Sequence, residues 1–437
     1  MAVNKYKVGI RREDKNQWEA RVPLTPQQVR ELINSGSFEF TVQTSEIRAY
    51  RNREYEEAGA QVAEDLSSCD LVIGVKEMPV SLFAAGGKYL FFSHTIKGQP
   101  YNMGLLRTIM ERGCTLMDYE RIVDEQNRRL IAFGPYAGLA GMIDGLWLLG
   151  QRLQTEGVST PLAKIKQANQ YAGYEEAAAA IQAVGEEIRI SSLPESCTPL
   201  VIGFAGYGKV SQGAQKVLLN LPIIEINPEK LLTLEGGVKN CIYKVVFQEQ
   251  HTVKHRAGRP FDLQHYYGNP VEYISDFEKY LPKLNVLMNC VYWEKRYPRI
   301  VSKDSLARLY RSENPKLKVI GDISCDVNGA IECTSHCTNS GQPTYLYDTV
   351  SGQELDAFAG RGPLILAIDN LPAELASDSS REFGGILSHM LPEFIGADFG
   401  RPFAQLNLPY HLKKAIIVYN GELTPDYMYL REHLKSN

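Results

Sequence analysis

Short apolar runs alternate with longer amphipathic segments along most of this chain. The segment after Thr25 has the clearest helix start, because Pro26 stands at the first helical position and Gln28 can close a capping box with Thr25. Strand–helix alternation at this spacing predicts an α/β fold with mostly parallel sheets. The apolar runs predict strands at residues 5–10, 38–42, 71–75, 89–92, 115–117, 242–247, 285–290, 317–322 and 364–368.

Other segments predict the connections between these strands. Residues 121–123 and 130–133 have the composition of a further pair of strands, and residues 248–269 show no clear period and predict a loop. Helical periodicity extends over the segments 26–34, 102–113, 138–153, 171–184 and 383–395. The apolar helix at 138–153 is suited to connect two domains.

Residues 199–226 read as a buried strand, a glycine turn, an amphipathic helix and a second strand. Gly206 can make the tight turn, Gly208 lets the backbone approach a pyrophosphate, and Gly213 lets the helix pack closely on the sheet. The third fingerprint position is Ser211, so the spacing departs from the usual motif. The flanking strand and helix nevertheless predict a dinucleotide site. Its expected cofactor-binding residues are Gly206, Tyr207, Gly208, Lys209 and Val210.

This glycine-rich unit lies in the middle of the chain, with α/β patterns on both sides. We therefore expect two Rossmann-like domains with parallel sheets and an active site in the cleft between them. The substrate and catalytic domain is predicted to be discontinuous, residues 1–138 plus 372–437, and the dinucleotide-binding domain to span 139–371.

The amino-acid composition indicates which kinds of binding partner can be expected. The 437 residues are 44% hydrophobic and 22% charged, with a net charge of −4, which gives no reason to expect nucleic acid or an anionic membrane. A small anionic substrate would need a local basic pocket. The eight cysteines are scattered, and Cys333 with Cys337 lacks further ligands, so a plain loop is favoured over a metal site. No signal segment or long apolar run is present, which predicts a cytoplasmic protein.

Polar groups follow several predicted strands and are the candidates for chemistry. Arg21 can clamp a carboxylate, or belong to a solvated charge run. Lys76 can act as a base when partly buried, or lie on the surface beside a carboxylate. His94 can exchange protons near neutral pH, or be a structural histidine. Asp322 and Asp369 can face the nicotinamide ribose or the substrate, or cap helices.

Together these segments resemble the alanine dehydrogenase and transhydrogenase superfamily. The similarity is closer to the lysine–2-oxoglutarate reductase/saccharopine dehydrogenase family, including the reductase domain of aminoadipate semialdehyde synthase, and covers almost the whole chain. The chain has no room for the second, saccharopine-oxidising domain of the bifunctional members. The motifs that carry the resemblance are residues 21–26, 75–77, 92–97, 130–141, 291–294, 322–324 and 369–372, together with the glycine turn.

The resemblance implies reductive condensation of lysine with 2-oxoglutarate to saccharopine, or the reverse. It assigns Lys76 as the base and His94 as the acid–base group, with Glu77 and Glu120 tuning their pKa values. The remaining implied site residues bind substrate: Lys15, Arg21, Lys97 and Asp369. The alternatives are another imino- or amino-acid dehydrogenase, similar to alanine dehydrogenase, and a non-catalytic dinucleotide-binding protein.

The sequence also bears on the cofactor. A carboxylate that ends the second strand binds the ribose of NAD, but Glu225 lies inside the predicted strand and Asn227 follows it. With Lys230 nearby, NADP(H) is favoured by a small margin, and NAD(H) is the other candidate. Asp322 is a further expected cofactor contact.

Overall fold

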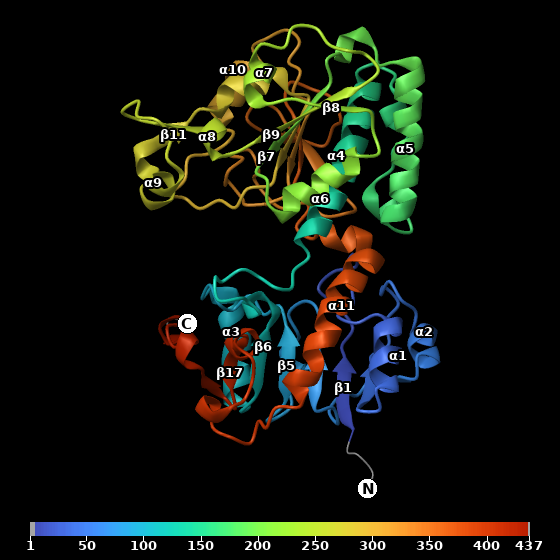
Figure 1. Cartoon of the computed structure of the whole chain (residues 1–437), viewed down its shortest axis with the longest axis vertical. Coiled ribbons are helices and arrows are strands. Elements are labelled where there is room, and N and C mark those ends of the chain that lie inside the picture. Colours follow the sequence, from blue (N-terminus) through green and yellow to red (C-terminus); the bar gives the residue numbers. More distant parts are fainter. Residues whose placement is uncertain (1–4, 436–437) are drawn as a thin grey trace. The chain divides into compact units, whose positions relative to one another are not determined.

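A computed structural model describes residues 5–435 (Figure 1). The chain divides into two compact units. Unit 1 comprises Met1–Phe133 and Ala376–Asn437, and unit 2 comprises Gly134–Leu375. Each unit is built on its own eight-stranded sheet. The predicted α/β class with two mostly parallel sheets is thereby confirmed.

The sheet of unit 1 has the strand order β18-β17-β6-β5-β4-β1-β2-β3. Six strands are parallel and follow the doubly wound order 3-2-1-4-5-6, while β17 runs antiparallel to β6 and β18 antiparallel to β17. The strands are β1 Tyr6–Ile10, β2 Phe38–Val42, β3 Gln61–Val62, β4 Leu71–Ile73, β5 Lys88–Phe91, β6 Thr115–Asp118, β17 Ile416–Tyr419 and β18 Glu422–Leu423.

Helices cover both faces of this sheet. One hydrophobic cluster joins the strands to α1, α2, α11 and α12, and another joins them to α3 and α13. The predicted capping box of α1 is present, since the Thr25 side chain accepts from the Gln28 N–H and Gln28 accepts from the Thr25 N–H. The helices are α1 Pro26–Asn34, α2 Asn52–Glu57, α3 Pro100–Glu111, α11 Ala376–Ile395, α12 Tyr410–Lys414 and α13 Leu430–Lys435.

The sheet of unit 2 has the order β15-β14-β16-β13-β12-β7-β9-β8. Six strands are parallel again, with β14 and β15 antiparallel at one edge. Here β9, rather than β8, lies next to β7, so β8 becomes an edge strand. The strands are β7 Val201–Ala205, β8 Ile223–Glu225, β9 Ile242–Phe247, β12 Val286–Asn289, β13 Val319–Asp322, β14 Thr344–Tyr347, β15 Glu354–Leu355 and β16 Leu364–Leu366.

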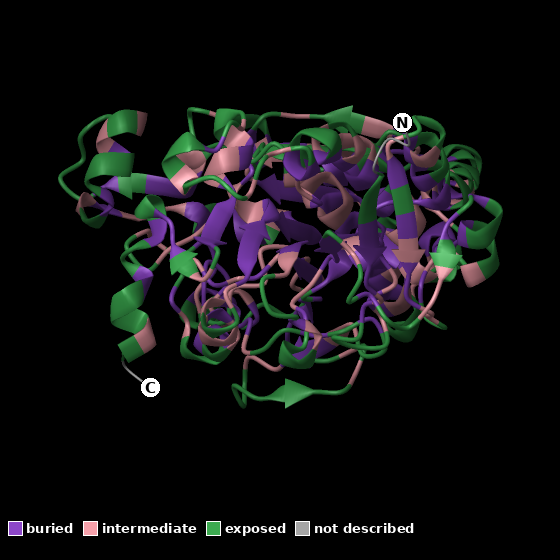
Figure 2. Cartoon of the chain, turned by 90° about the horizontal axis from the view of Figure 1, so that it is seen from below, coloured by how far each residue is buried: buried purple, intermediate pink, exposed green. Residues whose placement is uncertain are grey.

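Alternate residues of these strands face two separate clusters. One cluster packs against α4 (Gly134–Thr155), α5 (Tyr174–Ser191) and α6 (Lys209–Leu218), and the other against α7 (Pro228–Leu232) and α10 (Lys303–Leu309). Figure 2 shows the strands of the sheets mostly buried and the helices exposed along their outer faces.

Three local predictions differ from the structure. Residues 121–123 and 130–133 form no strands, and only an isolated bridge joins Val123 to Arg129. The predicted loop at 248–269 contains regular structure: α8 (Glu249–Thr252), β10 (Val253–His255) and α9 (Leu263–Gly268), with β10 pairing to β11 (Tyr273–Ser275). These elements are too short to show a period.

The third difference concerns Gly213. A Cβ at this residue would lie 2.1 Å from the Pro135 carbonyl oxygen of α4, so Gly213 allows α6 to pack closely on α4 and not, as predicted, on the sheet. Gly138 of α4 makes the reciprocal approach, since a Cβ there would lie 1.9 Å from the Val210 carbonyl oxygen.

Candidate active site

Polar side chains of unit 1 gather at the carboxyl ends of β1, β4, β5 and β6. The strand order reverses between β1 and β4, and ligands of open α/β sheets bind outside the carboxyl ends of the strands at such a switch point. Glu13 follows β1, Lys76 and Glu77 follow β4, His94 follows β5, and Asp118 ends β6.

Glu77 links two of the predicted site residues. Its Oε1 lies 2.6 Å from His94 Nδ1, and Lys15 Nζ donates to its Oε2 over 3.1 Å. Burial alone would raise the pKa of Glu77, but the hydrogen bond and charge of His94, aided by Lys15, lower it to about 2. Glu77 is therefore an ionised carboxylate that orients the His94 ring through Nδ1.

Glu13 fixes the backbone beside this carboxylate. The Glu13 side chain is buried, its Oε1 accepts from the Val75 N–H over 2.6 Å, and its Oε2 accepts from the Lys76 N–H over 2.9 Å. Burial raises the pKa of Glu13 to about 7, against the lowering effect of Arg11 and of the two N–H groups. The main chain of the half-buried Lys76 is thus held by the carboxyl group of Glu13, which follows the neighbouring strand β1.

His94 has an unusual backbone conformation. Its φ is +52°, in the left-handed region that non-glycine residues rarely occupy. Asn102 Nδ2 donates to the His94 carbonyl oxygen over 3.0 Å, and the preceding Ser93 N–H donates to Asp118 Oδ2 over 2.9 Å. Burial raises the pKa of Asp118 to about 6, while Ser93 and then His94 act to lower it. Such strain persists only where surrounding contacts enforce it, as at many active sites.

The other predicted substrate and tuning residues of unit 1 differ in their surroundings. Glu120 forms an ion pair with Arg129, and the carboxylate that accepts from the backbone beside His94 is that of Asp118. Arg21 is buried in a two-point ion pair with Glu19, its Nε and Nη2 donating over 2.8 and 2.7 Å. Lys97 is exposed on the loop after His94.

Sequence reasoning did not select Glu13, and of the two carboxylates after residues 115–117 it assigned a role to Glu120 but not to Asp118. Glu13 stood within the charged run of residues 11–15, and Asp118 was one of two carboxylates after a predicted strand. Glu13 follows β1, which borders the switch point, and Asp118 ends β6, a parallel strand of the same sheet. A carboxylate near the carboxyl end of a parallel strand is the signal that could have found both.

The glycine turn of unit 2 has the geometry expected of a phosphate-binding turn. Gly206 follows β7 with a φ of +94°, and Gly208 is the N-cap of α6. A Cβ at Gly208 would meet no atom within 4 Å, so this side of the helix N-terminus is open. The chain therefore fits a dinucleotide pyrophosphate here. Tyr207 and Lys209 are exposed and Val210 is half-buried.

A pocket of about 530 Å³ adjoins this turn. Its walls come from the carboxyl ends of β7, β9 and β12 and include the aromatic residues Tyr207, Phe247, Tyr266, Tyr267, Tyr292, Trp293 and Tyr297. Glu249, the first residue of α8, also lines it and accepts from Tyr267 Oη over 2.7 Å. Flat aromatic walls beside a phosphate turn suit a purine ring.

The strand order changes which residue is expected to contact the ribose of the cofactor. The sequence prediction placed ribose recognition after β8, at Asn227 and Lys230, but β8 is separated from β7 by β9. Glu225 ends β8, rather than lying inside it, and pairs with Lys244 over 2.8 Å. The Asn227 side chain caps α7 by accepting from the Lys230 N–H, and Lys230 is exposed. The carboxylate that follows β9, the strand between β7 and β8, is Glu249.

The two aspartates proposed for cofactor or substrate lie in different environments. Asp322, at the end of β13, is 1% exposed and accepts from Asn289 Nδ2 and Thr334 Oγ1 over 2.8 and 2.7 Å. Burial raises its pKa to about 6. Asp369 is exposed in the turn after β16. A direct contact with a ligand is thus open to Asp369, whereas the Asp322 carboxylate is enclosed by protein groups.

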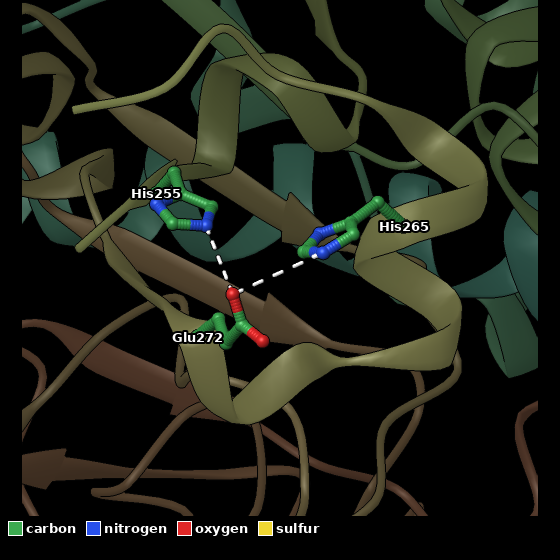
Figure 3. Close-up of side chains that lie close together, drawn as sticks. All are labelled: His255, His265 and Glu272. Atoms are coloured by element: carbon green, nitrogen blue, oxygen red, sulfur yellow. Dashed lines mark hydrogen bonds and ion pairs between the residues drawn. The ribbon is translucent and has the colours of Figure 1, made fainter. Parts of the chain in front are cut away.

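His255, His265 and Glu272 form a cluster in the β10–α9–β11 segment (Figure 3). Glu272 Oε2 lies 3.1 Å from His255 Nε2 and 3.9 Å from His265 Nε2. The Ala257 N–H donates to His255 Nδ1, so in the neutral ring the proton sits on Nε2 and donates to Glu272. A metal-bound histidine normally donates from its second nitrogen, so the hydrogen bonds fit a protein cluster better than a metal centre.

Part of the chain matches the model of a known family, and almost all of it is similar to known proteins. Residues 9–140 match the model of the alanine dehydrogenase/PNT N-terminal domain. Over 98% of its length the chain is 38% identical to alpha-aminoadipic semialdehyde synthase of Arabidopsis thaliana, and over 99% it is 35% identical to the mitochondrial alpha-aminoadipic semialdehyde synthase of Bos taurus. The chain spans 42% and 49% of these relatives, less than half of each.

More distant similarities extend over complete proteins. The chain is 25% identical to the NAD(+), L-lysine-forming saccharopine dehydrogenase of Emericella nidulans, covering 94% of this chain and 98% of that one. An L-alanine dehydrogenase structure matches with a TM-score of 0.62 at 19% identity over 98% of this chain and 99% of that chain, which shows the shared fold. No helix within residues 5–435 is long and apolar enough to cross a membrane.

Proposed function

Because residues 9–140 match the model of the alanine dehydrogenase/PNT N-terminal domain and almost the whole chain is similar to alpha-aminoadipic semialdehyde synthases, we propose that this protein is an oxidoreductase of lysine metabolism. It condenses the ε-amine of lysine with 2-oxoglutarate and reduces the product to saccharopine, or catalyses the reverse. The structural observation that supports this most directly is the contact of Glu77 with both His94 and Lys15 at the switch point of unit 1.

The condensation needs a base and a proton carrier. Lys76 would take a proton from the incoming ammonium group, so that a neutral amine can attack the ketone carbon. His94, oriented by the ionised Glu77, would donate protons as the carbinolamine forms and loses water. A bound reduced nicotinamide supplies hydride to the resulting imine.

Cations would bind the carboxylate groups of the substrates. Lys15 and Lys97 are exposed cations on the loops that follow β1 and β5. In this proposal they hold substrate carboxylates. Saccharopine carries three carboxylates, which accounts for a cationic site in a protein whose net charge is −4.

We propose that Glu249 is the residue that distinguishes the two nicotinamide cofactors. It follows the strand adjacent to the glycine turn and lines the pocket beside that turn. A carboxylate at this position accepts hydrogen bonds from a free ribose 2′-hydroxyl and repels a 2′-phosphate. In this proposal Glu249 favours NAD(H), in place of the small preference for NADP(H) expected from Asn227 and Lys230.

Glu249→Ala should therefore weaken NAD(H) binding and strengthen NADP(H) binding, shifting the ratio of the two dissociation constants by about tenfold. Lys230→Ala is the matched control and should change neither constant, because Lys230 lies beyond the edge strand. Fluorescence titration of the reduced cofactors measures both. An unchanged ratio in Glu249→Ala would contradict this assignment.

The activity itself is tested with the purified protein and each reduced cofactor. Lysine plus 2-oxoglutarate should support cofactor oxidation, and mass spectrometry should show saccharopine. Oxidation with pyruvate plus ammonia, yielding alanine, would instead identify an alanine dehydrogenase-like enzyme. Cofactor binding without turnover on either substrate pair would identify a non-catalytic dinucleotide-binding protein. Cell fractionation would decide between the cytoplasmic location expected from the sequence and the mitochondrial location in the bovine relative's name, and light scattering would give the oligomeric state.

A further inference from the structure

Two cysteines meet beside the carboxyl ends of β13 and β16 in unit 2. Cys325 lies three residues beyond β13, is half-buried, and its Sγ lies 2.8 Å from the Ala367 carbonyl oxygen. Cys337 is exposed, and its Sγ lies 3.5 Å from the Cys325 carbonyl oxygen. The two thiols also lie within hydrogen-bonding reach of each other.

The surroundings give the two thiols different reactivity. A hydrogen bond from Cys325 lowers the pKa of Cys337, against the opposing effects of burial and of the Asp369 and Asp322 carboxylates. The same contact, together with burial, raises the pKa of Cys325. Cys337 is thus the exposed thiol with the greater thiolate character, and Cys325 is positioned to resolve an oxidised Cys337.

We propose that Cys325 and Cys337 form a reversible disulfide when the protein meets a small neutral hydroperoxide. The Cys337 thiolate attacks a peroxide oxygen, forming a sulfenic acid as the O–O bond breaks and hydroxide leaves. The Cys325 thiol then attacks that sulfur, and the sulfenic oxygen departs as water with the thiol proton. In sum, two thiols and one hydrogen peroxide give one disulfide and two waters.

The charged groups around Cys337 indicate which class of oxidant should react with it. Asp322, Asp326 and Asp369 all act electrostatically on the Cys337 thiol. Their carboxylates repel an anionic oxidant such as glutathione disulfide, whereas hydrogen peroxide carries no charge. Hydrogen peroxide should therefore form the link faster than an equal concentration of glutathione disulfide.

Oxidation of the two cysteines should alter the pocket beside the glycine turn. The loop after β13 is joined to that pocket through Ser324, whose Oγ donates to the carbonyl oxygen of the pocket residue Val291 over 2.5 Å. Cys325 itself has a φ of +54°, so its backbone is already in a strained conformation. A covalent link to Cys337 would restrict this loop and shift the position of Ser324. This consequence rests on the proposed dinucleotide site.

The link is tested by treating the full-length protein with hydrogen peroxide. The intact mass should fall by about 2 Da and recover with dithiothreitol. Proteolysis after Glu332 separates Cys325 from both Cys333 and Cys337, so a peptide joined across this cut reports a new disulfide. Cys325→Ser and Cys337→Ser should abolish the joined peptide, while Cys333→Ser, which removes a buried neighbouring thiol, should retain it.

The effect on binding is measured separately by fluorescence titration with NADH. Oxidation should change its dissociation constant by about fivefold in the wild type and in Cys333→Ser, and not in Cys337→Ser. Cys337 oxidised without a partner, or Cys325 joined to Cys333, would overturn the proposed site. A Cys325–Cys337 link without altered binding would overturn its regulatory effect. If the reduced protein bound no dinucleotide, the proposed cofactor site would fail while the mass measurement still decided the disulfide.

Discussion

At the scale of single residues, the chemistry proposed for unit 1 depends on one carboxylate. Glu77 accepts from Lys15 and contacts His94 Nδ1, and its pKa of about 2 keeps it ionised throughout the range in which enzymes of this kind are assayed. An ionised partner at Nδ1 stabilises the protonated imidazole and fixes the ring orientation. Glu77 is therefore a positioning residue for His94.

Replacing Glu77 by Gln should lower kcat by about 10-fold to 100-fold, because the ring loses a charged partner but keeps a hydrogen-bond acceptor. The alkaline limb of the pH–rate profile should move to lower pH, since His94 acts as a proton donor and loss of the carboxylate disfavours its protonated ring. Glu39→Gln, an exposed carboxylate that pairs with Lys5 in the same unit, is the control and should leave kcat and profile unchanged. A purely structural role for Glu77 would leave the pH profile in place.

The acid–base pair can be separated from cofactor binding. Lys76→Met and His94→Gln should each lower kcat by about 10²- to 10⁴-fold while leaving the dinucleotide dissociation constant nearly intact. The double variant should be little slower than the slower single variant, because groups that act as a unit are non-additive. Saccharopine formation, followed directly by mass spectrometry, measures this. Full activity in either single variant would refute the assignment.

At the scale of elements, two glycines on α6 have opposite roles. Gly208 borders open space, and its φ of −72° suits any residue, whereas Gly213 is pressed against the Pro135 carbonyl oxygen. The same helix thus presents an open N-terminus to a ligand and a closely packed face to α4. Contact between backbones at Gly213 and Gly138 fixes where the N-terminus of α6 lies within unit 2.

Valine at each position should separate the two roles. Gly208→Val should weaken dinucleotide binding by at least about 100-fold with little change in melting temperature, because its side chain would occupy space needed by the pyrophosphate. Gly213→Val should destabilise unit 2 by about 3 kcal/mol or more, because its side chain has no room against α4. Calorimetry gives both quantities. Unchanged cofactor affinity in Gly208→Val would show that the turn has only a structural role.

At the scale of the whole molecule, buried carboxyl groups set the dependence of stability on pH. Burial raises the pKa of Glu13 to about 7 and that of Asp118 to about 6. In unit 2, burial also raises the pKa values of Asp144 and Glu374, which lie close enough to interact, and Glu374 further raises that of Asp144. Each group keeps its proton in the folded state to higher pH than in the unfolded state. Stability should therefore fall as the pH rises from about 4.5 towards 7.

Glu374→Gln tests whether ionisation of a buried carboxyl group lowers stability as the pH rises. At pH 8 the variant should be more stable than the wild type by about 1 kcal/mol or more, because an amide replaces a group whose ionisation is costly in the interior. At pH 4.5 the difference should be smaller, since the carboxyl group is protonated in the folded state. Glu313→Gln, at an exposed position of unit 2, is the control. Thermal unfolding at the two pH values measures both, and an equal effect at both would count against burial as the cause.

The amino-acid sequence determined the elements whose signal is local. The period of apolar residues defined most parallel strands, and the capping box at Thr25 and Gln28 defined the start of α1. The α/β class followed from the alternation of these elements. The sequence also indicated Lys76, Glu77 and His94 after neighbouring strands, because residue type and position at a strand end are both visible in one dimension.

Only the tertiary structure decided which elements are neighbours. It placed β9 beside β7 and so moved the expected ribose contact from Asn227 to Glu249. It brought Glu13 to the backbone of Lys76, 63 residues away in the chain, and turned Gly213 towards α4 instead of the sheet. Hydrophobic period fixes which face of a strand or helix is buried. The order of strands and the contacts between distant carboxyl and amide groups depend on how those faces pack together, and no local pattern encodes that choice.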